Sequence, residues 1–114
     1  MHIMKLQEQY FNFIKDGTKI YEIRLNDEKR KMIKIGDYIE FQKEPKLEDK
    51  MILEVEDLLY FDNFSELFDN ISIVELADIS ISKDELKKDL ELFYSKEKQD
   101  EYGVVAIKLK KDNK

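Results

Sequence analysis

The sequence predicts an α+β fold, in which a small, mostly antiparallel sheet curls toward a barrel with helices at its edges. Five short segments alternate between apolar and polar residues, as strands do when one face packs on a core and the other meets water. Three other segments repeat apolar residues at the spacing of an amphipathic helix. Because these helices fall between the strands without a regular strand–helix repeat, an α+β arrangement is favoured.

Length and composition indicate one small domain. The chain has 114 residues, and we expect a single domain over residues 1–110 with a polar tail at 111–114. It has no cysteine, which excludes disulfides and thiolate metal sites. No apolar run approaches the roughly 20 residues that span a bilayer, and the N-terminus lacks the apolar stretch of a signal peptide. We therefore expect a cytoplasmic protein without a membrane segment.

The first half of the chain is expected to form three strands and one helix. The strands are expected at 2–6, 19–26 and 37–43, and the helix at 6–14. Gly17 fits the position just past this helix, where a left-handed conformation is common. In the third strand Ile39 and Phe41 point inward, and the charged residues 27–35 form a loop or a single helical turn.

The second half is expected to add two strands and two helices. The strands are expected at 51–61, with Met51, Leu53, Val55 and Leu59 inward, and at 104–109, with Val105, Ile107 and Leu109 on one side. Two capping patterns, a polar residue followed three positions later by glutamate, open the helices: Asn63 with Glu66, and Ser82 with Glu85. The first of these helices runs through Phe68, and the second carries Leu86, Leu90 and Phe93 on one face. Residues 44–50, 71–81 and 94–102 are expected to be connections without regular structure.

Charge is distributed unevenly along the chain. The net charge is −6, which argues against a general affinity for nucleic acid. Residues 19–34 hold six bases and three acids, a local charge of +3, whereas residues 54–102 hold 15 acids and five bases, a local charge of −10. A basic segment in an acidic protein suits a small or local anionic target better than a long duplex, whose many phosphates must be neutralised.

The most informative pair of charges lies in the strand expected at 19–26. Glu22 and Arg24 are two residues apart, so a strand places both on one face while its apolar residues point into the core. The ordinary explanation is a surface ion pair, worth ~0–1 kcal/mol. The alternative is a recognition pair, in which the guanidinium binds a phosphate, a carboxylate or a base edge, and the glutamate accepts from an amine or acts as a base.

Other candidate residues also allow two explanations. Strict alternation puts Lys19 on the face opposite Glu22, and it joins the pair only if the chain is still turning after Gly17; otherwise it is a solvated lysine near a helix end. A basic run follows, either as a solvated face or as phosphate contacts: Lys29, Arg30, Lys31 and Lys34. Tyr94 and Tyr102 are the tyrosines best placed to stack on a nucleobase, a contact worth ~1–3 kcal/mol.

Several kinds of active site are not indicated. His2 is the only histidine, which supports neither a histidine metal site nor a histidine-activated nucleophile. The acidic residues lack the spacing of a calcium loop, and the glycine-rich loops of nucleotide-binding folds are missing. We therefore expect no metal and no cofactor.

Three groups of motifs connect the chain to a known family. They are Gly17-x-Lys19-x-x-Glu22-x-Arg24 with Leu25-Asn26-Asp27 and Lys29-Arg30, then Gly36-Asp37-x-Ile39-x-Phe41, and finally Tyr94-Ser95-Lys96-Glu97 with Tyr102-Gly103-Val104-Val105-Ala106-Ile107. On these motifs the chain resembles the ASCH domain family of the PUA-like superfamily over nearly its whole length. The resemblance implies a five- to six-stranded PUA-like β-barrel with flanking helices and a cleft lined by the GxKxxExR strand.

The resemblance also implies a partner, because PUA-like domains bind RNA or modified bases. The family positions that match here are Lys19, Glu22 and Arg24, with Tyr94 near the cleft. With Asn26, Lys29 and Arg30, these are the seven residues expected to bind the ligand. Some small ASCH proteins are similar to amidohydrolases that remove an acyl group from N4-acylated cytidine. Where those carry a threonine nucleophile, this chain has Glu22.

We therefore expect the protein to bind RNA or a modified nucleoside or nucleotide. Arg24 is expected to contact phosphate or a base edge, Glu22 to accept from an amino group, and Lys19 to neutralise an oxyanion. The first alternative is a hydrolase of an acylated nucleoside, or a ribonuclease, with Lys19 and Glu22 as the catalytic pair; a lysine base then needs a pKa lowered by burial. The second alternative is a protein-interaction module that uses the acidic residues 54–102.

Overall fold

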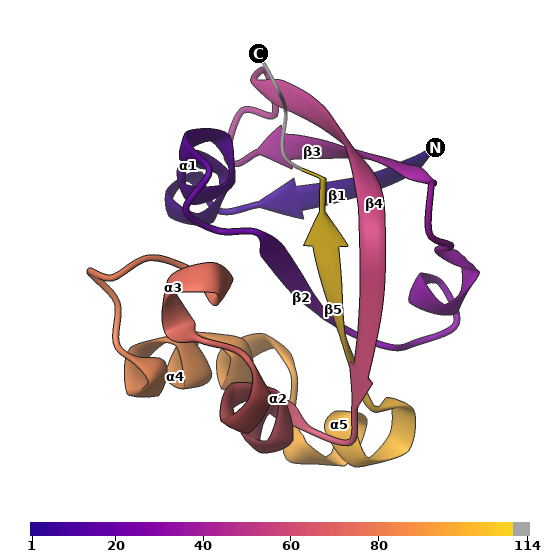
Figure 1. Ribbon diagram of the computed structural model, residues 1–114, viewed down its shortest axis with the longest axis vertical. Coiled ribbons are helices and arrows are strands. Elements are labelled where there is room, and N and C mark those ends of the chain that lie inside the picture. Colours follow the sequence, from indigo (N-terminus) through magenta and orange to yellow (C-terminus); the bar gives the residue numbers. More distant parts are fainter. Residues whose placement is uncertain (111–114) are drawn as a thin grey trace.

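The computed structural model describes residues 1–110, which form five strands, five α-helices and one 3₁₀ turn (Figure 1). The strands are β1 (His2–Leu6), β2 (Tyr21–Leu25), β3 (Tyr38–Lys43), β4 (Lys50–Phe61) and β5 (Val104–Leu109). The helices are α1 (Glu8–Asp16), α2 (Phe64–Asn70), α3 (Ile73–Leu76), α4 (Lys83–Phe93) and α5 (Lys96–Tyr102), and the 3₁₀ turn is η1 (Arg30–Met32). The tail predicted at 111–114 lies outside the described residues.

The strands form one curled sheet in the order β1-β3-β4-β5-β2. Only β1 and β3 pair in parallel, and the other three pairs are antiparallel. The helices α2, α3, α4 and α5 gather at one end of the sheet, while α1 lies beside β1 and β3 (Figure 1). The expected α+β architecture, a PUA-like barrel with flanking helices, is therefore confirmed, with β1 and β2 as the two edge strands of a half-barrel.

The central strand β5 divides the interior into two apolar clusters. Val105, Ile107 and Leu109 share one face, as alternation predicts, and pack with Ile39 and Phe41 of β3 against α1. Val104 and Ala106 face the other cluster, which is built mainly from the helices α2, α3 and α4. A strand buried on both faces explains why β5 reads as a continuous apolar run.

Local signals at the helix ends behave as predicted. Gly17 ends α1 in a left-handed conformation with φ 87°, which glycine adopts without steric cost. The side chains of Asn63 and Ser82 accept hydrogen bonds from the N–H groups of Glu66 and Glu85, at 2.8 and 3.2 Å. These caps satisfy N–H groups that have no partner within the helix.

Four predictions about the second half are wrong. Residues 71–81 contain α3 and residues 94–102 contain α5, because Ser72 and Ser95 cap these short helices through their hydroxyl oxygens. A bulge between Val55 and Asp57 breaks the alternation of β4, so Leu59 packs in the opposite cluster from Val55. Phe93, expected to be inward, is 65% exposed at the last residue of α4.

No helix among the described residues has the length and apolar character that a membrane crossing requires.

Candidate functional site

Both faces of β2 are buried, which the alternating pattern did not predict. Tyr21, Ile23 and Leu25 pack in the cluster beneath the helices, as expected. Glu22 and Arg24 share the opposite face and are bonded, with Arg24 Nε donating to Glu22 Oε2 at 2.9 Å. Glu22 is only 6% exposed, so this is a buried pair and the surface ion pair of the ordinary explanation is excluded.

Lys19 joins the pair because it precedes the regular strand. Ile20, just after it, donates its N–H to the carbonyl of Glu75 on α3. This departure from the strand path lets the Lys19 side chain turn inward, where it is 3% exposed and its Nζ lies 3.4 Å from Glu22 Oε1. The Nζ also donates to the main-chain carbonyls of Tyr21 at 2.6 Å and Leu76 at 2.7 Å.

The surroundings of Lys19 match an ammonium group. Its Nζ meets three acceptors, two carbonyl oxygens and one carboxylate oxygen, and an ammonium has three N–H donors. Burial lowers the pKa of Lys19 below its usual 10.5, while the Glu22 carboxylate opposes that shift. A neutral amine would turn a lone pair toward one of the three acceptors, so the geometry favours the charged form.

The two cations keep Glu22 ionised. Burial alone would raise the pKa of Glu22, but Arg24 and Lys19 outweigh it and hold the pKa below 4.5. Burial likewise opposes the charge on Arg24, whose pKa is nevertheless raised by Glu22 and, to a smaller extent, by Tyr94. The site is therefore a carboxylate held between two cations, and its net charge is positive.

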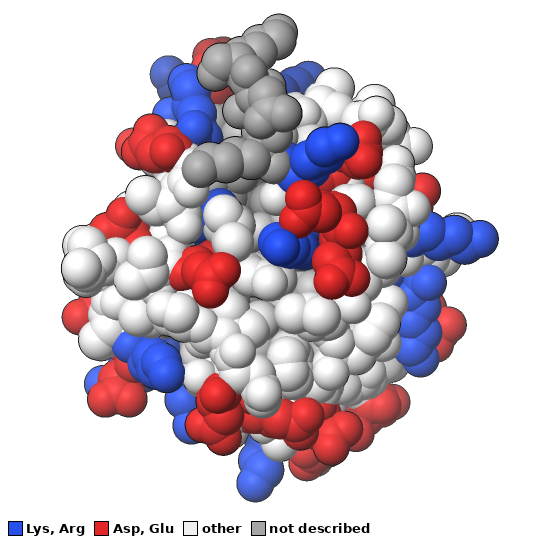
Figure 2. All heavy atoms as spheres, in the orientation of Figure 1, with Lys and Arg blue, Asp and Glu red and all other residues white. Residues whose placement is uncertain are grey.

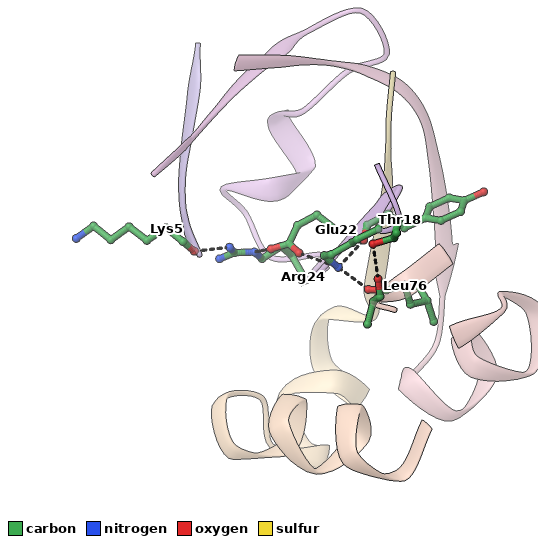
Figure 3. Close-up of polar contacts among 8 residues, drawn as sticks. Lys5, Thr18, Glu22, Arg24 and Leu76 are labelled. Carbon is green, nitrogen blue, oxygen red and sulfur yellow. Dashed lines mark hydrogen bonds and ion pairs between the residues drawn. The ribbon is translucent and has the colours of Figure 1, made fainter. Parts of the chain in front are cut away.

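The charged residues form a line that ties three elements together (Figure 3). At one end Lys19 bonds to the Leu76 carbonyl of α3, and at the other Arg24 Nη2 donates to the Lys5 carbonyl of β1 at 2.9 Å. Because β1 and β2 are the two edges of the sheet, the Arg24 side chain bridges the opening of the half-barrel. Thr18, next to Lys19 in the chain, bonds through its hydroxyl to Phe13 and Ala77 carbonyls.

A pocket opens beside this line, between the end of β1, the start of α1, β2 and α4. It is lined by Lys19, Glu22 and Arg24, and by the aromatic rings of Tyr10, Phe93 and Tyr94. Its volume is about 140 Å³. A cavity of about 150 Å³ accommodates a benzene molecule, so this pocket has room for one planar ring.

The aromatic lining of the pocket is fixed by contacts between α1 and α4. The Tyr10 hydroxyl donates to Asp89 Oδ2 at 2.7 Å, and burial together with that carboxylate raises the pKa of Tyr10. Tyr94 follows the last residue of α4 and packs against Phe64 and Phe93, with ring centroids 5.9 and 6.4 Å apart. The pocket therefore combines rigid aromatic walls with a buried charged edge.

Four of the seven residues expected to bind the ligand line this pocket, and three do not. Lys19, Glu22, Arg24 and Tyr94 line it. Asn26, Lys29 and Arg30 lie past the other end of β2, where Arg30 pairs with Asp27 at 3.5 Å. The segment with a local charge of +3 is thus divided between the buried site and a turn in which Lys29 is exposed and the Arg30 side chain is only 17% exposed, instead of forming one basic surface.

Several residues that line the pocket were not predicted from the sequence as site residues, among them Lys5, Tyr10, Ile23, Asp89 and Phe93. Tyr10 and Asp89 bond across 79 positions of sequence, and no local pattern reports such a contact.

Acidic side chains gather elsewhere on the molecule. Along the lower edge of Figure 2 they lie over α2 and α5, in the half of the chain with the local charge of −10. Within residues 1–110, no cluster of three or more carboxylate or histidine side chains is arranged to hold a metal ion.

The lowered pKa of Glu22 predicts a component of acid sensitivity. Between that pKa and about 4.5 the unfolded chain binds more protons than the folded chain, so the free energy of unfolding falls as the pH falls. We expect urea unfolding of the wild type to lose more stability below about pH 4.5 than the Glu22→Gln variant does. Equal losses in the two proteins would show that Glu22 is not held ionised by its neighbours.

Comparisons with known proteins agree with this fold. The ASCH domain family matches residues 4–112. A crystal structure of hypothetical protein PH0355 is 36% identical, covers 95% of each chain and has a TM-score of 0.83. The solution structure of protein PF0455 from Pyrococcus furiosus is 31% identical, covers 96% of this chain and 94% of its own, and has a TM-score of 0.71. None of the curated proteins compared with the chain matches it.

Proposed function

The chain belongs to the ASCH domain family, and on that premise we propose that the pocket between β1, β2 and α4 binds a nucleobase of RNA or of a modified nucleoside or nucleotide. The observation that carries this proposal is the position of the buried Lys19–Glu22–Arg24 line in the wall of a ring-sized aromatic pocket. Burying three charges is costly, and an arrangement of this kind is common where a polar ligand is bound.

Each residue has a distinct role in the proposed complex. Arg24 uses two of its five N–H groups on Glu22 and on the Lys5 carbonyl, so its planar fork retains donors for a phosphate or the edge of a base. Each oxygen of Glu22 has a second lone pair, which can accept from an exocyclic amine. Lys19 acts through Glu22: its ammonium group holds the Glu22 carboxylate in place and neutralises part of its charge.

The geometry favours binding over catalysis. A lysine acts as a general base through its lone pair, and every N–H of the Lys19 ammonium already faces an acceptor. An acyl-transfer mechanism needs a nucleophile, and no serine, threonine or cysteine is among the residues that line this pocket. We therefore propose a binding domain in which Lys19 and Glu22 position and recognise the ligand.

The basic turn is proposed to contact the backbone of a longer ligand. Lys29 and Arg30 follow the end of β2, beyond Arg24 in the direction of the strand. An RNA whose base occupies the pocket can place neighbouring phosphates there, where contacts add affinity without reading sequence. These residues are thus expected to matter for an oligonucleotide and to be neutral for a free nucleoside.

The proposal is tested by calorimetric titration of free ribonucleosides and of a short single-stranded RNA into the wild type and two variants. Tyr94→Ala removes an aromatic wall of the pocket, and we expect binding to weaken about 5- to 150-fold, the equivalent of ~1–3 kcal/mol of stacking. Tyr60→Ala removes a tyrosine that is 57% exposed and outside this pocket, and it serves as the matched control.

Two results would contradict the proposal. The first is the absence of binding for every ribonucleoside and RNA tested with the wild type. The second is equal weakening by Tyr94→Ala and Tyr60→Ala while circular dichroism shows both variants folded.

A further inference from the structure

We propose that the main chain of Ile23 reads the ring bound in this pocket, with its N–H donating to a ring acceptor and its C=O accepting from the neighbouring ring donor. This inference rests on the proposed function and deepens it, because it assigns the pocket a hydrogen-bonding edge that does not depend on a side chain. It follows from the pairing of β2, from the burial of Ile23 and from the position of the pocket.

The pairing of β2 with β5 fixes the direction of each peptide group. At the two ends of this pair Leu109 donates to the Ile20 carbonyl, and Asn26 donates to the Gly103 carbonyl. In an antiparallel pair the residues that bond across alternate with residues that do not. With a uniform register between these ends, the even-numbered residues of β2 bond to β5, and the odd-numbered residues, including Ile23, turn their N–H and C=O away from it.

The main-chain groups of Ile23 need a partner. Ile23 is 3% exposed, and residues 1–110 supply no backbone or side-chain partner for its N–H or C=O. Main-chain groups inside a protein are nearly always hydrogen-bonded to protein, water or ligand, so groups of Ile23 that face a cavity take their partner from what occupies it. Tyr21 is the preceding residue whose main-chain groups turn away from β5. Its carbonyl accepts a hydrogen bond from the Lys19 side chain.

The pocket lies along this edge of the strand. Its lining includes Ile23, whose side chain points to the helices, and also Glu22 and Arg24, whose side chains point to the opposite face. A cavity that touches both faces of a strand must lie over its edge. The groups of Ile23 that face away from β5 therefore face the pocket.

Tyr21, Ile23 and Leu25 all turn their main-chain groups away from β5, and of these three only Ile23 lines the pocket. Lys19 covers the Tyr21 carbonyl, and the Arg24 side chain crosses to the Lys5 carbonyl. A peptide strand adding to a sheet needs several consecutive free residues, so this edge does not suit an added strand. One N–H and one C=O on the same side suit a small planar group that presents an acceptor beside a donor.

The ligand class that fits is a heteroaromatic ring with a ring nitrogen or carbonyl next to an N–H group. The acceptor of the ring takes the Ile23 N–H, and the donor of the ring binds the Ile23 C=O. All nucleobases that pair through hydrogen bonds carry such an edge. Glu22 and Arg24 are then free to read a second part of the ring.

Two small rings of nearly equal shape test this inference in the intact protein. The ring of 2-aminopyrimidine carries an acceptor beside a donor, whereas 2-methylpyrimidine has the acceptors and no donor. We expect 2-aminopyrimidine to bind roughly tenfold more tightly, because the second ring leaves the Ile23 carbonyl unpaired. Amide hydrogen exchange measured by NMR should slow at Ile23 on binding. It should stay unchanged at Leu25, whose N–H also turns away from β5 but which does not line the pocket.

A backbone variant provides an independent test. Incorporating the α-hydroxy acid of isoleucine at position 23 replaces the N–H by an oxygen and retains the side chain. We expect this variant to fold, because the N–H of Ile23 is not part of the β2–β5 hydrogen bonding. It should bind 2-aminopyrimidine roughly tenfold more weakly than the wild type. The same replacement at Leu25 should leave the affinity unchanged.

The outcomes separate the inference from the proposed function. If both rings bind equally and Ile23 exchange is unaffected while the pocket still takes nucleosides, the main-chain role is wrong and the proposed function stands. If neither the two small rings nor any nucleoside binds, both the main-chain role of Ile23 and the proposed function are wrong. Weaker binding of the position-23 ester than of the Leu25 control supports the main-chain role.

Discussion

Glu22→Gln is expected to destabilise the protein by about 3–5 kcal/mol, the usual cost of leaving a buried charge without its partner. The substitution keeps the shape of the side chain but removes the carboxylate that neutralises Lys19 and Arg24, both largely buried. Because small domains unfold with about 5–15 kcal/mol, such a loss is a large part of the total. Urea unfolding at neutral pH measures it directly.

Two further variants show whether charge is the cause. Glu28→Gln makes the same chemical change at a side chain that is 88% exposed, and it should leave the unfolding free energy within about 0.5 kcal/mol of the wild type. The triple variant Lys19→Met, Glu22→Gln, Arg24→Met removes all three charges, and we expect it to recover part of the stability lost in Glu22→Gln. A Glu22→Gln midpoint equal to that of Glu28→Gln would refute the role given to the buried line.

Arg24→Lys is expected to abolish most ligand binding although the charge is retained. A guanidinium bonds Glu22 and the Lys5 carbonyl at once and still presents donors to the pocket, whereas an ammonium on a flexible stem cannot hold this planar geometry. We expect the affinity for a bound nucleoside to fall at least about tenfold, a loss typical of one charge-assisted hydrogen bond.

The matched control for this variant is Arg30→Lys. It makes the same exchange in the basic turn, where Arg30 pairs with Asp27 outside the pocket. Calorimetry with the same nucleoside should give the wild-type affinity for Arg30→Lys. If the two variants bind equally, either both weakly or both as the wild type, Arg24 has no special part in the pocket.

Local sequence patterns predicted the strands well and the site only in part. The shared face of Glu22 and Arg24 followed from the two-residue period of a strand, and the bond between them confirms it. The inward turn of Lys19 could not be predicted, because it depends on a hydrogen bond from Ile20 to Glu75 on a helix 55 positions away in sequence. The burial of Glu22 and Arg24 was not predicted, because it depends on the packing of β1 and α4 against β2. A sequence pattern within β2 contains no information about that packing.

The same limit explains the errors in the helices. Ser72 and Ser95 cap α3 and α5, yet these helices are four and seven residues long and carry little apolar periodicity. Short helices are marginal alone and are stabilised by packing, as Leu76 shows by being fully buried. Prediction from the sequence therefore located the longer helices and strands, and it failed for short helices and for single side chains whose direction depends on tertiary contacts.

The side-chain Nε–H signals of arginine provide the most direct test of the claim that the pocket binds a nucleobase. The chain has two arginines, Arg24 in the pocket and Arg30 in the basic turn, so an ¹⁵N-labelled sample reports both places in one spectrum. We expect a saturating nucleoside to move the Arg24 Nε–H signal and leave that of Arg30 in place. A nucleoside that binds and moves the Arg30 signal while leaving Arg24 unchanged would contradict the claim.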